Sequence, residues 1–469
     1  MNTVFLLVIL FFLCLVLFMI NNARMISVSF LTSLSFLTST AIYLLNYKYY
    51  ERDLSTNACS IIIWSIVFLA IGEYFAIILR TGGVLRKKET RNNTEIANQS
   101  YLSISAKRCK FLILSSFIIA FIKLVILFHN ARSMGFVGSL LSITQFMRGR
   151  IISGEYGYPA IIIYLSYYID CVAYYFLFLF FYKAIVFKEY DKILLLIVPA
   201  YLIAAFASTG RTELISLFFY IFVCFFHIRH CVNRKKDRKN DRRINKFFFI
   251  SIVLIVFLFG LFGNLRNEEL GSLVDMVSSY YSASLFGLDE FISRNNASPV
   301  VWGEMVFSNV YKIIDMIFKT ELYTVVGTNP FGAFYWKTSQ GIFFSNIYTG
   351  LAIPLHDFGV SGLFVSRLLI GFLFGYIFGG NRFNTISIKN SIHIVMMCIV
   401  MICPLLSPVA DRYYTFLSIS PIRYLVFLIL IRKYLKIQEK VERINGAEDV
   451  YDESYYSAKN YFRIGKQKG

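Results

Sequence analysis

Charged residues are scarce in this sequence. Asp, Glu, Lys and Arg make up 16% of its 469 residues, whereas hydrophobic residues make up 57%. Soluble chains carry roughly 25% charged residues, and a chain of this length would need a polar surface around two or three cores. The composition therefore excludes a soluble enzyme and indicates a polytopic membrane protein.

Several motifs that would identify other functional classes are also missing. There are only eight Pro, and no run alternates apolar and polar residues as a membrane barrel does. The eight Cys form no CxxC pair and the five His form no ligand spacing, so we expect no disulfide framework, no metal site and no cofactor. The absence of a Walker loop argues against an ATP-driven pump, and the absence of a DxD motif from the loops argues against metal-bound nucleotide sugars.

Long apolar runs predict an all-α fold of about eleven membrane helices, within a range of 10–12. The expected spans are 3–20, 26–45, 58–79, 111–128, 161–187, 193–207, 214–228, 247–262, 359–379, 391–408 and 414–431. The spans 193–207 and 214–228 are short and close together, which suits either a hairpin or a broken helix. We expect four parts: helices and loops over 1–262, a large loop over 263–358, the last helices over 359–431 and a tail over 432–469.

Basic residues cluster in alternate loops, which sets the expected orientation. One set holds 31 of the 47 Lys and Arg residues and is assigned to the cytoplasm: 21–25, 80–110, 188–192, 229–246, 380–391 and 432–469. The alternating set is longer but holds only 12: 46–57, 129–160, 208–213, 263–358 and 409–413. We therefore expect an external N-terminus and a cytoplasmic C-terminus. The formal net charge of +19 is a topology signal and does not indicate nucleic acid.

The external loop 263–358 is too long for a simple connector. Apolar residues recur at helical spacing from Val306 to Phe318, which predicts an amphipathic helix at the membrane surface. A second helix is expected over about 272–292. The apolar but interrupted segment 341–359 suits a re-entrant turn. The external face is therefore expected to carry the function.

External arginines are the first candidate site residues: Arg148, Arg150, Arg211 and Arg266. Arg211 lies in the segment 208–213 (STGRTE), at the start of a membrane helix, and helix N-termini favour anions. The guanidinium group is suited to fork-like binding of phosphate, so this set is typical of a lipid-diphosphate site. The alternative for each is pairing with a local carboxylate or with lipid headgroups.

His356 and Asp357 are the second candidates, because a carboxylate or imidazole in a partly dry site can act as a general base. The alternative for Asp357 is a capping role at the helix that follows it. Charged residues within or beside spans are expected to line one outward-facing cavity, or to form structural ion pairs such as Lys123–Asp170. This third group comprises Lys123, Asp170, Arg367 and Arg412.

These features together resemble the oligosaccharide repeat-unit polymerases, the Wzy-type family of O-antigen and capsule polymerases. The resemblance rests on the 208–212 segment (STGRT) opening a helix, on the long external loop, and on the 346–349 segment (NIYT) followed by Asp357-Phe358-Gly359 and Gly362. It covers the whole chain in topology and two short stretches in sequence.

The resemblance implies a GT-C-like, metal-independent glycosyltransferase of the bacterial inner membrane with a periplasmic active face. It would transfer a growing glycan from undecaprenyl diphosphate to the sugar of a new lipid-linked repeat unit, and a chain-length regulator protein is a candidate partner. The four arginines would hold the diphosphates. Asp357, helped by His356, would activate the acceptor. Four residues are candidates for contacts with sugars: Tyr335, Trp336, Asn346 and Tyr348.

Three other classes remain alternatives. An O-antigen ligase would share this plan but transfer the glycan to a lipid A core, and a catalytic histidine in the large loop would favour it. A lipid-linked oligosaccharide flippase would be a two-lobed transporter that has no need of a 96-residue external loop. A membrane acyltransferase would require paired His and Asp within the spans, and none is found.

Overall fold

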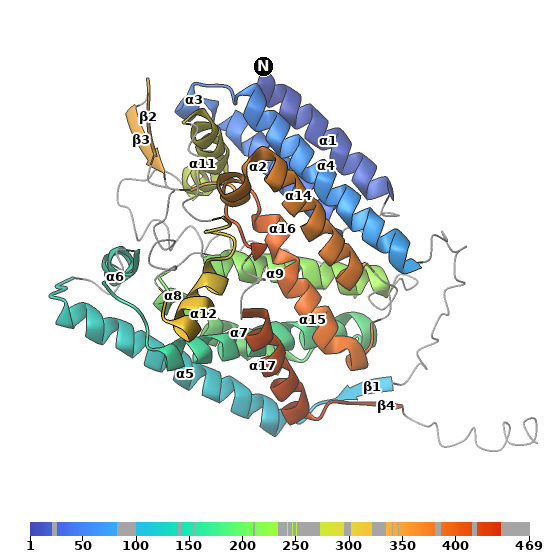
Figure 1. Ribbon diagram of the computed structural model, residues 1–469. Coiled ribbons are helices and arrows are strands. Elements are labelled where there is room, and N and C mark those ends of the chain that lie inside the picture. The colour runs from blue at the N-terminus through green and yellow to red at the C-terminus, as the bar shows by residue number, and fades with distance from the viewer. Residues whose placement is uncertain are drawn as a thin grey trace, which may run out of the picture.

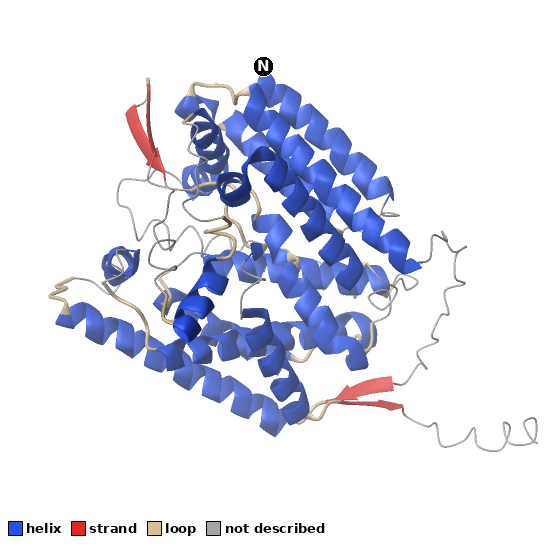
Figure 2. Ribbon diagram, in the orientation of Figure 1, coloured by secondary structure: helices blue, strands red, loops and turns tan. Residues whose placement is uncertain are grey.

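The structure is a computed structural model that describes residues 1–20, 26–81, 100–138, 142–152, 155–209, 212–232, 273–294, 302–320, 334–339, 341–345, 347–379, 386–414 and 420–441, with isolated positions at 242, 246 and 250. The chain is mostly helical, as predicted (Figure 2). Strands form two short two-stranded ladders, β1 with β4 and β2 with β3.

The helices of the first half are α1 (Asn2–Ile20), α2 (Val28–Leu45), α3 (Tyr47–Tyr50), α4 (Thr56–Thr81), α5 (Ala106–Ser133), α6 (Ile143–Ile152), α7 (Ala160–Tyr182), α8 (Ile197–Ala207) and α9 (Thr212–Cys231). Those of the second half are α11 (Leu273–Ser293), α12 (Ser308–Phe318), α14 (Ala352–Phe378), α15 (Ser391–Val400), α16 (Ile402–Leu406) and α17 (Ser420–Leu435). Tighter or wider turns extend three of them: η1 (Lys183–Phe187), η2 (Lys192–Leu196) and η4 (Ile388–Asn390). The strands are β1 (Ser100–Ser103), β2 (Phe334–Thr338), β3 (Gly341–Ser345) and β4 (Gln438–Val441).

Within these described ranges, eight helices are long and apolar enough to cross a membrane. They match eight of the eleven predicted spans. The predicted span 193–207 is a shorter apolar helix, Lys192–Ala207. The span 414–431 corresponds to α17 (Ser420–Leu435), and residues 415–419 lie outside the described ones. The predicted span 247–262 lies outside the described residues.

Two groups of helices form the bundle (Figure 1). In the first, α1, α2, α4 and α14 pack together, with α11 against α2 and α4. In the second, α7 contacts α5, α8, α9, α15 and α17. The second half of α7 and the turn η1 are enclosed, so that every residue from Cys171 to Val186 is buried.

Helices α4 and α14 approach so closely that glycine is required between them. A Cβ atom built at Gly371 would lie 2.0 Å from the carbonyl oxygen of Leu69, and one at Gly72 would lie 2.0 Å from that of Leu368. Because lipid supplies little hydrophobic force between helices, such close backbone packing stabilises membrane bundles. The contact fixes α14, whose first turns carry His356 and Asp357.

Glu73, a charged residue within α4, is fully used by the fold. Its carboxylate accepts hydrogen bonds from the backbone N–H groups of Val28 (3.1 Å) and Ser29 (2.9 Å), and from the hydroxyls of Ser27 and Ser29. It therefore satisfies the unpaired donors at the positive end of α2. This contact accounts for a buried intramembrane charge in structural terms.

Loops predicted to share a side of the membrane contact one another. At one end of the bundle, Trp336 donates to the carbonyl of Tyr49 and Arg52 pairs with Asp289, which ties the 46–55 loop to the large loop. At the opposite end, strands β1 and β4 pair antiparallel (Figure 1). The sequence assigns the first pair of segments to the outside and the second pair to the cytoplasm, so these contacts agree with the predicted grouping.

The described parts of the large loop are helical where predicted, in α11 and α12. Val310, Ile317 and Phe318 of α12 are exposed, whereas Val306 before it is buried. The segment 341–359, expected to suit a re-entrant turn, divides into strand β3 and the first turns of α14. Helix α14 is divided at Gly359 (φ 67°, ψ −171°), so its longer part starts where the span 359–379 was predicted and a short helical stretch from Ala352 precedes it.

Candidate functional site

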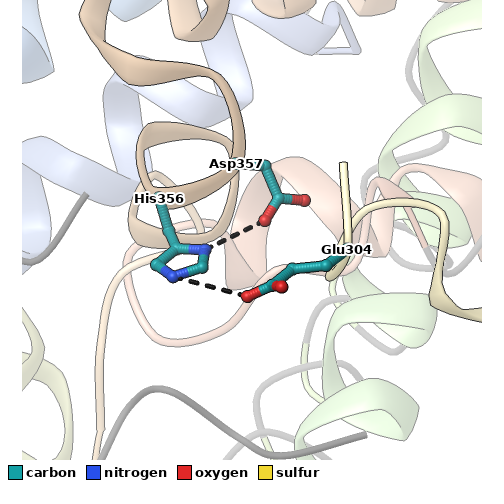
Figure 3. A group of neighbouring side chains, drawn as sticks. All are labelled: Glu304, His356 and Asp357. Carbon is teal, nitrogen blue, oxygen red and sulfur yellow. Dashed lines mark hydrogen bonds and ion pairs between the residues drawn. The ribbon is translucent and has the colours of Figure 1, made fainter. Parts of the chain in front are cut away.

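A buried group of three titratable side chains lies where the large loop meets α14 (Figure 3). Glu304 comes from the turn at 302–307, and His356 and Asp357 come from the first turns of α14. The exposed fractions are 5% for Glu304, 3% for His356 and 2% for Asp357. Buried titratable groups in contact mark a candidate functional site.

Asp357 is held by the backbone of the opposing turn. Its Oδ2 atom accepts hydrogen bonds from the N–H groups of Met305 (3.0 Å) and Val306 (2.7 Å). Gly303 has a φ of 69°, which suits glycine, and starts this turn. The capping alternative assigned Asp357 to the start of the helix that follows it. Its carboxylate instead caps the turn before α12. The carboxylate position is fixed and one of its oxygens is already occupied.

His356 bridges the two carboxylates. Its Nδ1 lies 3.0 Å from Asp357 Oδ1, and its Nε2 lies 3.5 Å from Glu304 Oε1. Each ring nitrogen faces a carboxylate, which accepts when ionised, and the contact of Nδ1 with Asp357 is the shorter one. We therefore assign the proton of the neutral ring to Nδ1, which leaves the lone pair of Nε2 on the side of Glu304. An imidazolium formed here would lie between two carboxylates. The geometry therefore suits a proton relay in which His356 takes the proton and Asp357 orients the ring.

The same three side chains offer ligand atoms that lie within 4.8 Å of one another, so they could hold a metal ion. Their arrangement fits this role less well, because the two carboxylates contact opposite nitrogens of the ring. Asp357 also has one oxygen committed to two backbone donors. A hydrogen-bonded relay uses all of these contacts, whereas one metal ion would have to replace some of them.

Arg367 of α14 lies deeper, at the turn that follows the 346–349 segment. It is 1% exposed, its Nη2 donates to the carbonyl of Gly350 (2.6 Å), and its guanidinium lies 4.9 Å from the ring centre of Tyr413. Gly350 in turn donates to the carbonyl of Ser407 (2.7 Å), so this turn is anchored to the 407–414 loop.

Asp411 in that loop lies near Arg367 and is half-buried, with its Oδ2 atom enclosed. Burial raises the pKa of its carboxyl from 3.8 to about 7, while the positive charge of Arg367 and the backbone N–H groups of Tyr413 and Tyr414 oppose the increase. Its Oδ2 atom and two nitrogens of Arg367 have no hydrogen-bond partner among the described residues. Arg367 and Asp411 therefore form a second group of titratable side chains inside the protein, separate from the group at His356.

Lys123, Asp170 and Arg412 line a single cavity of about 370 Å³, and Arg367 is not part of its lining. The walls come from the helix ends that the sequence assigns to the external side: the first half of α7, the end of α8, the start of α9, the 403–412 segment and the start of α17. Three of the four residues that were expected to share a cavity therefore line this one.

Lys123 and Asp170 contact different partners, and the described residues include no ion pair between them. Lys123 Nζ donates to Ser208 Oγ (2.6 Å) and lies 5.4 Å from the ring centre of Tyr158. Asp170 Oδ2 accepts from the hydroxyl of Tyr424 (3.2 Å). Lys123 thus reaches the segment 208–213, although Gly210 and Arg211 lie outside the described residues.

The four predicted diphosphate ligands are only partly described. Arg148 and Arg150 lie on α6, where Arg150 forms an ion pair with Glu155. That contact corresponds to the local-carboxylate alternative for Arg150. Arg211 and Arg266 fall outside the described residues, as does Asn346.

The aromatic candidates differ in their surroundings. Trp336 stacks on Tyr50 and Phe334 and packs at a tilt against Phe286, and its Nε1 donates to the carbonyl of Tyr49, so it contributes to the packing of the fold. Tyr348 is half-buried against Phe291 and Phe334. Tyr335 is 66% exposed and remains accessible to a ligand.

Three residues of these sites were not predicted from the sequence. Glu304 belongs to the group at His356, and Tyr424 and Glu213 line the cavity. Glu304 is a lone carboxylate in an apolar stretch, which is a weak signal of a buried partner. The contacts of Tyr424 and Glu213 arise from helices far apart in the sequence, so no local pattern marks them.

Comparisons with known protein-family models, curated proteins and solved structures find no match to this chain. What the protein does is therefore inferred from its residues and their geometry.

Proposed function

We propose that this protein is a glycan polymerase of the bacterial inner membrane. It would transfer the growing glycan from undecaprenyl diphosphate to a sugar hydroxyl of a new lipid-linked repeat unit. The observation that carries the proposal is the buried Glu304–His356–Asp357 relay, set at the edge of a helix bundle by the large loop.

The chemistry needs a proton acceptor at the attacking hydroxyl and cations at the leaving group. The acceptor hydroxyl loses its proton to His356 Nε2 as its oxygen bonds to the anomeric carbon of the donor glycan. The bond from that carbon to the diphosphate oxygen breaks, and the lipid diphosphate leaves with the electron pair. Asp357 and Glu304 stabilise the imidazolium that forms.

Charge that develops on the leaving diphosphate is stabilised by cations placed in advance. The proposal assigns this role to Arg148, Arg150, Arg211 and Arg266. Arg150 would exchange its ion pair with Glu155 for the diphosphate, a contact exposed enough to be broken at small cost.

The proposed function also requires a particular orientation of the chain in the membrane. The chain would cross the membrane eleven times in a GT-C-like arrangement, with the relay and the cavity on the periplasmic side and the C-terminus in the cytoplasm. The separation of basic from nearly neutral loops supports this orientation.

A ligase that transfers the glycan to a lipid A core is the second candidate. One observation favours it, namely that a histidine, His356, lies at the centre of the buried group, in contact with both carboxylates. The two activities share the leaving group and the base, and they differ in the acceptor.

A glycan ladder separates these candidates. Cells that lack the gene should show core plus a single repeat unit if the protein is a polymerase, and core alone if it is a ligase or a flippase. Complementation with His356→Ala should reproduce the single-repeat product at normal protein level. His129→Ala, which changes an exposed histidine at the same predicted side, should restore the full ladder. A full ladder from His356→Ala would overturn the proposed relay.

A further inference from the structure

The cavity that contains Lys123 and Asp170 is lined by an unusual mixture of groups. Among the described residues that line it, two are cations, Lys123 and Arg412, and two are carboxylates, Asp170 and Glu213. Five tyrosines also line it: Tyr158, Tyr167, Tyr174, Tyr201 and Tyr424. Hydroxyl side chains add to the polar lining: Ser166, Ser208, Thr212, Ser216 and Ser420. Its volume of about 370 Å³ falls within the range of small-molecule sites, roughly 300–1,000 Å³.

The balance of charge indicates which ligand chemistry fits. A diphosphate offers only acceptors and negative charge, so it would face two carboxylates as well as two cations. A sugar offers hydroxyls that both donate and accept, together with apolar C–H faces. Carboxylates accept, ammonium and guanidinium groups donate, and tyrosine hydroxyls do both. The described lining therefore matches a neutral, polyhydroxylated ring better than an anion.

Glu213 gives an independent sign of a missing contact. It lies in the first turn of α9, which explains how its charge is tolerated. Its Oε2 atom is nevertheless buried and has no hydrogen-bond partner among the described residues. A buried carboxylate oxygen without a donor is costly, and a sugar hydroxyl in the adjoining cavity would supply that donor.

Tyrosine contacts hold other polar groups of the cavity in place. Tyr424 donates to Asp170 (3.2 Å), and Tyr201 donates to the carbonyl of Glu213 (2.9 Å). These bonds fix both carboxylate-bearing residues before a ligand arrives, which reduces the entropy lost on binding.

We propose that this cavity binds a pyranose ring of the lipid-linked oligosaccharide, as a saccharide subsite. Glu213 accepts a hydrogen bond from a ring hydroxyl, Asp170 and Tyr424 contact a second hydroxyl, and Lys123 donates to a ring or hydroxyl oxygen. The inference rests on the proposed function for the identity of the saccharide. It does not depend on the relay at His356.

The test measures binding rather than turnover, with full-length protein in lipid nanodiscs and isothermal titration. Two probes are compared: the undecaprenyl-diphosphate-linked repeat unit extracted from the producing strain, and undecaprenyl diphosphate alone. Glu213→Gln should weaken binding of the saccharide-bearing lipid about tenfold or more, as expected for loss of a hydrogen bond to a charged group. Binding of undecaprenyl diphosphate should change by less than about twofold.

Tyr424→Phe is a second, more conservative variant, and it should weaken the saccharide-bearing lipid by about threefold to tenfold. Its matched control is Tyr175→Phe, because Tyr175 is buried, makes one hydroxyl contact with Ser391 (3.0 Å) and lies outside the cavity lining. The control should bind both probes as the wild type does. Thermal unfolding of each variant verifies that it is folded.

Other outcomes overturn the inference. Equal losses for both probes would make the cavity a diphosphate site, and no loss for either probe would make it structural. Failure of the polymerase proposal would look different. In that case the wild type would still bind the saccharide-bearing lipid through Glu213 and Tyr424, while deletion of the gene would leave the glycan ladder intact.

Discussion

Replacing Asp357 by Asn should separate the proposed catalytic role of this residue from its structural role. Asn offers one carbonyl oxygen, which can still accept from the N–H groups of Met305 and Val306. Its amide NH2 then faces His356 Nδ1, which must accept instead of donate. The ring proton moves to Nε2, and that atom can no longer take a proton from a hydroxyl.

The magnitudes of the two effects differ. Loss of general-base function costs about 10²–10⁴ in rate, equivalent to about 3–5 kcal/mol. The free energy of unfolding should fall by no more than about 1.5 kcal/mol, because the backbone hydrogen bonds survive. Asp357→Ala leaves two buried N–H groups without acceptors, so it should lose activity and also about 2–6 kcal/mol of stability.

The assay combines the initial rate of lipid-linked dimer formation with thermal unfolding in the same detergent. Two results would refute this reasoning. One is an Asp357→Asn enzyme that retains more than about a tenth of wild-type activity. The other is an Asn variant as unstable as Asp357→Ala, which would make the residue purely structural.

Three further predictions concern the scaffold. Glu73→Ala removes the acceptor of four hydrogen bonds at the start of α2 and should lower the free energy of unfolding by about 3–6 kcal/mol, and Glu73→Gln by about half as much, in thermal unfolding. Gly371→Ala should cost about 1–3 kcal/mol by forcing α14 from α4, whereas Gly157→Ala, with open space around it, should leave the midpoint unchanged. Because the pKa of Asp411 is raised from 3.8 to about 7, the folded protein holds a proton that the unfolded chain releases. Stability should therefore fall as pH rises from about 4 to 7, by up to about 4 kcal/mol, and Asp411→Asn should flatten this dependence.

Hydropathy was sufficient to predict most membrane helices, because a long apolar run has few other stable environments. It placed the start of the span 359–379 where Gly359 divides α14, but it missed the preceding helical stretch, where Pro354, His356 and Asp357 suggested an interruption. Pro354 is tolerated in a first helical turn, and the polar side chains find partners in the 302–307 turn. The short β2–β3 hairpin has a weak pattern and was not predicted.

Candidate site residues could be chosen from the sequence where a polar or charged side chain falls in an apolar segment, because burying such a side chain in lipid costs free energy. His356 and Asp357 could be chosen in this way, as could Lys123 and Asp170 within their spans. Their partners could not be predicted, because the contact of Glu304 with His356 joins positions about fifty residues apart through the fold. The assignment of Trp336 to a sugar contact likewise missed its packing in the aromatic cluster.

Reconstitution tests the central claim most directly. The purified protein is placed in liposomes with the undecaprenyl-diphosphate-linked repeat unit as sole substrate, and lipid products are followed by mass spectrometry. The account predicts lipid-linked dimers and longer oligomers with release of one undecaprenyl diphosphate per transfer, and their loss in His356→Ala. Unchanged monomer from protein that is folded and binds the substrate would contradict it.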